Sequence, residues 1–182
     1  MRLFIGLSVP DLYRDNARSM IDAVRATTPS KVSWTKPENL HLTLKFLGNV
    51  DAASLPTIIE ALSGIRFPAF TMRAGGVHAF PDKGKPRVLW LGLKEGAAEC
   101  ADLADLINQA LVPAGFEAEE HPFRSHITLG RVKRYEGDDL RAELRSREIP
   151  WPPFTAENFT LWNSDTLPEG PVYTPQAKFT LC

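Results

Sequence analysis

The sequence is poor in cysteine and has no long apolar run. Its two cysteines, Cys100 and Cys182, lie far apart and form neither a disulfide framework nor a CxxC metal-binding pair. The apolar stretch before Pro10 is too short for a signal sequence or a membrane span, so it predicts a first strand. These absences favour a protein of the reducing cytoplasm that holds no metal or other cofactor.

An excess of charge of one sign is also lacking. The chain has 21 lysines and arginines against 22 aspartates and glutamates, for a net charge of -1. This balance argues against a protein that binds long nucleic-acid tracts, so any such contact must come from a local basic patch. No linker or low-complexity tract divides the 182 residues. We expect one domain, a monomer with no obligatory protein partner.

The spacing of apolar residues predicts alternating strands and helices. Hairpin-like loops join several of the strands, which favours an α+β fold with antiparallel or mixed sheets over a doubly wound parallel sheet. The expected strands cover residues 2–9, 32–34, 40–47, 67–80, 88–93, 125–132, 154–162 and 172–181, and the expected helices cover residues 12–26, 51–63, 97–112 and 138–147.

The chain also repeats itself. His-Leu-Thr-Leu at 41–44 recurs as His-Ile-Thr-Leu at 126–129, and each copy is followed by a helix and then by Pro-x-Phe-Thr. The phenylalanine of that second pattern follows its histidine by 29 residues in the first copy and by 28 in the second. Matched order and spacing indicate an internal repeat rather than chance.

Each copy pairs a histidine with a threonine on one face of a strand. Because side chains alternate along a strand, His41 and Thr43 point one way, as do His126 and Thr128. If a pseudo-two-fold axis relates the copies, both pairs face one cleft. Two imidazoles with a pKa near ~6.5 can exchange protons as acid and base, while the hydroxyls bind phosphate oxygens. This set suits phosphoryl transfer without a metal.

Basic and aromatic neighbours of these strands are further candidates. Lys45 alternates onto the face of His41, and Arg124 onto that of His126, so either contacts a phosphate or is simply solvated. Phe46 or Trp90 either stacks on a base or is buried in the core. The other two histidines, His78 and His121, have no repeated context and are expected to be structural or in a loop.

Residues 41–48 and 122–131 resemble the paired signatures of the 2H phosphoesterase superfamily. The chain is most similar there to the branch of RNA 2′,3′-cyclic phosphodiesterases, also called 2′-5′ RNA ligases. The resemblance runs nearly end to end, through residues 2–5, 32–34, 37–40, 86–92 and 168–173. Ser125 departs from the branch, which often has proline at that position.

The resemblance implies a bilobal fold with a central cleft between two pseudo-symmetric sheets, with helices outside. It implies hydrolysis of the P–O3′ bond of RNA 3′ ends or small cyclic nucleotides, leaving a 2′-phosphate. His41 is then the proton donor and His126 the proton acceptor. Arg131 is expected to contact phosphate or ribose, although strict alternation puts it opposite His126 unless a bulge intervenes. A 2′-5′ RNA ligase and a non-catalytic nucleotide- or RNA-binding module remain the alternatives.

Overall fold

Antiparallel pairing joins the strands of this computed structural model, which describes residues 1–119, 121–137 and 139–182. The strands are β1 (Arg2–Ser8), β2 (Lys31–Trp34), β3 (His41–Asn49), β4 (Phe70–Phe80), β5 (Val88–Glu95), β6 (Ile127–Arg134), β7 (Phe154–Ala156), β8 (Asn158–Leu167) and β9 (Gly170–Thr180). The helices are α1 (Asp11–Arg25), α2 (Leu55–Ser63), α3 (Ala97–Leu111) and α4 (Leu140–Ser146), with 3₁₀ turns η1 (Pro37–Asn39) and η2 (Ala52–Ser54). The predicted α+β class is confirmed.

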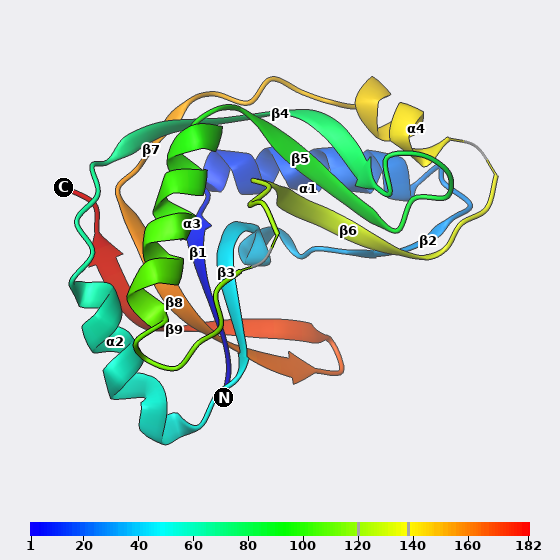
Figure 1. Ribbon diagram of the computed structural model, residues 1–182. Coiled ribbons are helices and arrows are strands. Elements are labelled where there is room, and N and C mark those ends of the chain that lie inside the picture. The colour runs from blue at the N-terminus through cyan, green and yellow to red at the C-terminus, as the bar shows by residue number, and fades with distance from the viewer. Residues whose placement is uncertain (120, 138) are drawn as a thin grey trace.

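The strands form one curled sheet that narrows at its middle. Its order is β7-β4-β5-β6-β3-β1-β8-β9, and β2 pairs with β6 beside this path. The two motif strands, β3 and β6, are joined only where Leu42 lies opposite Ile127. This narrow junction defines a first lobe (β3, β1, β8, β9) and a second lobe (β6, β2, β5, β4, β7), seen in Figure 1. The two expected sheets are therefore continuous through one residue pair.

Each half of the sequence sends a helix to the lobe that holds the other half's motif strand. Helix α3, which precedes β6 in the chain, packs against β3 of the first lobe beside α2. Helix α1, which precedes β3, packs on the second lobe. There the buried Tyr13 hydroxyl accepts a hydrogen bond from the Ala74 amide of β4 at 3.0 Å and donates one to the Pro152 carbonyl at 2.7 Å. This exchange ties the two lobes together.

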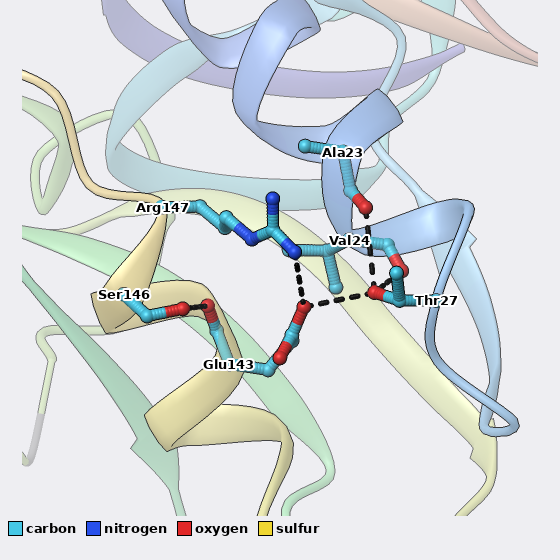
Figure 2. A network of polar contacts seen from close by, with 6 residues as sticks. All are labelled: Ala23, Val24, Thr27, Glu143, Ser146 and Arg147. Atoms are coloured by element: carbon cyan, nitrogen blue, oxygen red, sulfur yellow. Dashed lines mark hydrogen bonds and ion pairs between the residues drawn. The ribbon is translucent and has the colours of Figure 1, made fainter.

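Polar contacts hold α4 against the end of α1, as Figure 2 shows. The Glu143 carboxylate accepts a hydrogen bond from the Thr27 hydroxyl at 2.8 Å and pairs with the Arg147 guanidinium at 3.3 Å. The same threonine oxygen lies near two carbonyl oxygens of the last turn of α1. Since α1 and α4 come from different halves, this network also joins the two copies of the repeat.

Two predicted elements differ from the structure. The expected strand 154–162 is interrupted at Glu157, because β7 pairs with β4 of the second lobe while β8 pairs with β1 of the first. The expected helix 51–63 begins as the 3₁₀ turn η2, and α2 starts at Leu55 next to Pro56, a residue suited to the first helical turn. Asp138, the predicted start of the last helix, lies outside the described residues.

The core lies between the curled sheet and the helices. The four aliphatic residues that alternate with the histidines and threonines of the motifs are buried: Leu42, Leu44, Ile127 and Leu129. Cys100 is buried in α3, while Cys182 is exposed. In the described ranges, no helix combines the length and apolar character needed to cross a bilayer.

Candidate active site

The two motif strands meet at a cavity of about 500 Å³ between the lobes. His41 and Thr43 of β3 line it together with Thr128 of β6 and His126, the residue just before β6. A cavity of this volume accommodates a nucleotide-sized ligand. The structure therefore brings together the four side chains for which the sequence predicts chemistry.

The two histidines are oriented in the same way. The Nδ1 atom of His41 lies 2.7 Å from the carbonyl oxygen of Asn39, and the Nδ1 atom of His126 lies 2.8 Å from that of Arg124. Each partner is two residues before its histidine. Because a carbonyl oxygen only accepts, Nδ1 is the protonated nitrogen in both rings. Nε2 is thereby left as the nitrogen that gains and loses the proton.

His41 is packed against aromatic side chains. Its ring centroid lies 4.8 Å from that of Phe4 and 5.3 Å from that of Tyr173, and its Nε2 atom lies 3.0 Å from the Thr43 hydroxyl. Burial lowers the pKa of His41, the Asn39 carbonyl raises it, and the positive charge of His126 lowers it further. The pKa of His41 is lowered on balance, which favours the neutral ring.

His126 stands against an aromatic wall. Its ring meets the edges of Phe80 and Trp90, each with a centroid separation of 5.9 Å. The Arg124 guanidinium lies over these two rings, 4.9 Å and 5.3 Å from their centroids, and 3.8 Å from the Asp82 carboxylate. Arg124 is not among the described residues that line the cavity. The predicted phosphate contact stays a prediction, and the structure places the Arg124 guanidinium in a cation–π contact beside His126.

Each motif strand contains a β-bulge at the same position. Register shifts leave Leu44 without a partner in β1 and Leu129 without a partner in β5. A bulge inserts one residue, so the alternation of faces is displaced beyond it. The fifth residue after each histidine consequently faces the cavity: Phe46 in the first copy and Arg131 in the second. The bulge that Arg131 requires is present.

The same bulge removes Lys45 from the cavity, which corrects the expectation that it shares the face of His41. Its side chain is 6% exposed, and its ammonium group donates to the Asn108 side-chain oxygen at 2.6 Å and to the Glu117 carbonyl at 3.1 Å. Lys45 thus joins β3 to α3 and to the segment that leads toward His126. Its position makes it a structural residue.

The two candidate stacking residues, Trp90 and Phe46, differ in their exposure. Trp90 is 4% exposed and lies between His78 and Phe80, with ring centroids 4.6 Å and 4.8 Å away. Phe46 is 65% exposed and lines the cavity. Of these two, Phe46 is the one that a ligand can reach. His78, expected to be structural, is exposed at its place beside Trp90.

Sequence reasoning missed three contributors to the site. Buried Asn39 orients His41 through its carbonyl while its amide donates to the Pro171 carbonyl at 2.7 Å. Tyr173 closes the cavity from β9, and burial raises the pKa of its hydroxyl. Gly6 lets β1 approach β3, since a Cβ atom there would lie 2.7 Å from the Leu42 oxygen. The flanks 37–40 and 168–173 carried a signal for the first two.

No three histidine, cysteine, aspartate or glutamate side chains gather as a metal-binding group within the part of the chain that the structure describes. The polar side chains that line the cavity include the two imidazoles, the two threonine hydroxyls and the charged groups of Arg131, Arg2, Lys36 and Glu169. Imidazoles, hydroxyls and guanidinium groups can bind an anion and move protons.

A bilobal antiparallel sheet with one histidine–threonine pair from each lobe defines the two-histidine phosphoesterase class. Comparison with known proteins gives the family. Residues 7–90 and residues 91–173 match the LigT-like phosphoesterase family, and each stretch contains one histidine motif. The chain belongs to this family, which confirms the resemblance seen in the sequence and the prediction of a phosphoesterase.

Relatives of similar length support the assignment. The RNA 2′,3′-cyclic phosphodiesterase of Archaeoglobus fulgidus is 35% identical over 95% of this chain and 96% of its own length. The enzyme of the same name from Aquifex aeolicus is 32% identical over 100% and 97%. Among solved structures, Thermus thermophilus TT0787 aligns with a TM-score of 0.79 at 27% identity, covering 100% of this chain and 98% of its own. E. coli LigT, crystallised with 3′-AMP, aligns with a TM-score of 0.76 at 26% identity, covering 99% and 97%.

Proposed function

We propose that this protein hydrolyses the 2′,3′-cyclic phosphate of RNA ends to a 2′-phosphate, with His41 and His126 as its proton-transfer pair. The observation that carries the proposal is the common orientation of the two rings: both Nδ1 atoms are held by backbone carbonyls, and both side chains line one cavity. Relatives named RNA 2′,3′-cyclic phosphodiesterase support the reaction, and E. coli LigT has been crystallised with phosphate and with 3′-AMP.

The reaction needs one proton taken up and one delivered. His126 accepts a proton from water through Nε2 while the water oxygen forms a bond to phosphorus. The P–O3′ bond breaks, and His41 delivers its Nε2 proton to the departing 3′ oxygen. Thr43 and Thr128 donate hydrogen bonds to the non-bridging oxygens, whose charge is concentrated in the transition state. The strained ring of the substrate makes these groups sufficient without a metal.

Substrate binding is expected to protonate His41, the proposed acid. Before a phosphate binds, burial and the charge of His126 favour neutral His41. A bound phosphodiester brings a negative charge beside the ring, which favours the imidazolium form. The donor is thus charged when substrate is present. Arg131 adds a positive charge on the same side as His126 and binds a phosphate oxygen or the ribose.

The walls of the cavity suit a nucleoside rather than a bare phosphate. Phe46 presents an exposed ring from the first lobe, and Trp34 presents part of its indole from β2 of the second lobe. Aromatic faces stack on bases of any identity, which suits an enzyme acting on varied RNA ends.

Turnover of 2′,3′-cyclic AMP in the presence of EDTA tests the proposal. We expect the wild type to produce 2′-AMP at an undiminished rate in EDTA, and the His41→Ala and His126→Ala variants to be nearly inactive. Phosphorus NMR of the product identifies the oxygen that keeps the phosphate. A 3′-phosphate product would show that the other bond breaks, and inhibition by EDTA would reject metal independence.

Two other outcomes would support the alternatives. If purified protein joins RNA halves through a 2′-5′ bond faster than it opens the cyclic phosphate, ligation is its main reaction. If it binds 2′-AMP in the cavity but turns over neither substrate, it is a binding module.

A further inference from the structure

Exposed lysines gather at one end of the second lobe. We define the lysine rim as Lys31, Lys83, Lys85 and Lys133, all of which are exposed. Lys31 begins β2 and Lys133 lies near the end of β6, while the other two lie in the connection from β4 to β5. Figure 1 shows that these three segments lie together at the end of the lobe away from the first lobe.

Hydrogen bonds fix the rim's loop to the sheet and to α4. The Arg141 guanidinium donates to the carbonyl oxygens of Gly84 and Pro81 at 2.9 Å and 2.8 Å. The Val132 amide of β6 donates to the Arg87 carbonyl at 2.8 Å. The lysines of this loop therefore project from a held backbone, which keeps their charges close to the end of β6.

The positive charges of the rim lysines are unpaired among the described residues. No ion pair within 4.0 Å joins a rim lysine to a carboxylate in the described ranges, and the nearest acidic residues along the chain have other partners. Asp82 lies 3.8 Å from Arg124, and Glu136 lies 2.7 Å from Arg134. A chain with a net charge of -1 thus has a local cationic surface, as a nucleic-acid contact requires.

The rim continues a wall of the proposed active site. Ser33 lies opposite Arg131 in the β2–β6 pairing, and both line the cavity. Lys31 precedes Ser33 by two residues, so it lies on the same face of β2, about 7 Å farther from the cavity. The cationic path therefore starts at Arg131, inside the cavity, and runs outward over the second lobe.

The opposite wall carries charges of both signs. There Glu169, at the tip of the β8–β9 hairpin, lines the cavity together with Arg2 and with Lys36, which approaches Gly170, and Asp165 precedes another lining residue, Thr166. A polyanion that left the cavity over the first lobe would pass these carboxylates. Charge complementarity therefore favours the second lobe as the exit for an RNA chain.

We propose that RNA on the 5′ side of the cyclic phosphate leaves the cavity past Arg131 and binds along the lysine rim through its phosphates. The preferred substrate is then an RNA chain of several nucleotides rather than a cyclic mononucleotide. The proposal rests on the proposed function, and it adds the surface that binds the RNA chain beyond the terminal nucleotide. Because lysines bind phosphates as point charges, the rim adds affinity without selecting base sequence.

Salt dependence tests this surface in the wild type. We measure kcat/KM for 2′,3′-cyclic AMP and for a hexaribonucleotide ending in a 2′,3′-cyclic phosphate, from 50 to 200 mM salt. Each single-strand phosphate contact contributes about 0.7 to the logarithmic slope, so three contacts lower the hexanucleotide value roughly 20-fold over this range. The mononucleotide value is expected to fall far less. Equal salt dependence for both substrates would overturn the proposal.

The combined variant Lys31→Ala, Lys83→Ala, Lys85→Ala tests the rim directly. We expect kcat/KM for the hexanucleotide to fall about tenfold at 50 mM salt, with 2′,3′-cyclic AMP turnover unchanged. The slope of log kcat/KM against log salt concentration should become less steep by about 2. Lys178→Ala is the matched control, because Lys178 is also an exposed lysine on an edge strand, β9, but in the first lobe. The Lys178→Ala variant should leave kcat/KM for both substrates unchanged.

The outcomes separate the two proposals. Unchanged hexanucleotide turnover in the triple variant, or an equal loss for both substrates, would reject the rim. Absence of wild-type turnover of either substrate would reject the proposed function instead. In that case, fluorescence anisotropy with a labelled hexanucleotide ending in a 2′-phosphate still decides the rim, since equal affinity of wild type and triple variant would overturn it.

Discussion

The two half-sites of the cavity are alike where chemistry needs them to be alike. In each, a carbonyl two residues earlier holds Nδ1 of the histidine, a threonine follows on the same face, and a bulge comes after the threonine. The half-sites differ from the fourth residue after each histidine onward. The first copy has buried Lys45 and exposed Phe46, and the second has Gly130 and Arg131.

The repeat thus preserves the geometry around each histidine and varies the side chains that follow the bulge. Phe46 and Arg131 occupy equivalent positions after equivalent bulges, yet one offers an apolar ring and the other a cation. The surroundings differ as well: His41 lies between Phe4 and Tyr173 in the more enclosed half, and His126 lies on the wall that Arg124 covers. The two copies of the repeat therefore give the cavity two chemically different walls.

Removing either histidine is expected to have the largest effect. His41→Ala and His126→Ala should each lower kcat by about 10²- to 10⁴-fold, the usual contribution of a general acid or base. Because both serve one proton-transfer step, the double variant should be little worse than the poorer single variant. Single-turnover kinetics with 2′,3′-cyclic AMP measures all three. Losses that multiply would show that the two half-sites act independently.

Phe46 and Arg131 each lie five residues after their histidine, and replacing them should show how much stacking and charge each contribute to binding. Arg131→Ala removes a charge-assisted contact and should raise KM about 10- to 100-fold. Phe46→Ala should raise KM only severalfold, because it removes one aromatic contact. Both variants should keep most of kcat, and saturation kinetics distinguishes KM from kcat. A larger effect of Phe46→Ala would reverse the assignment of the two half-sites.

Lys45→Met should change stability rather than binding. The substitution leaves the Asn108 side-chain oxygen and the Glu117 carbonyl without their donor, at a cost of about 1–3 kcal/mol in the free energy of unfolding. Urea unfolding measures this cost, with Lys178→Met as the exposed-lysine control. A raised KM with unchanged stability would contradict the structural role and return Lys45 to the cavity.

The smallest expected effect concerns the charge of one histidine on the other. The charge of His126 lowers the pKa of His41, so His126→Gln should raise it. Proton NMR titration of the His41 ring in wild type and variant measures the direction. An unchanged His41 titration in His126→Gln would mean that the rings do not interact.

The pKa of His41 should also separate the pH profiles of the two kinetic constants. If His41 is the acid, the alkaline limb of kcat/KM should lie at lower pH than that of kcat, because bound phosphate raises the pKa of the acid.

Much of the site could be predicted because its information is local. Alternation alone puts His41 with Thr43 and His126 with Thr128, and the repeat marks them as a pair. The α+β class likewise follows from apolar spacing and hairpin loops, and most element bounds agree within a few residues. Burial of the intervening leucines follows from the same alternation.

Which flanking residues reach the cavity depends on pairing between strands that are distant in the sequence. The bulges at Leu44 and Leu129 arise from pairing with β1 and β5, strands distant in the sequence, and they put Arg131 into the cavity and Lys45 outside it. Arg124 lies over Phe80 and Trp90 for the same reason, since those rings come from two other strands. Periodicity along one strand determined the face that carries the histidines and threonines, while register between strands determined which residues surround them.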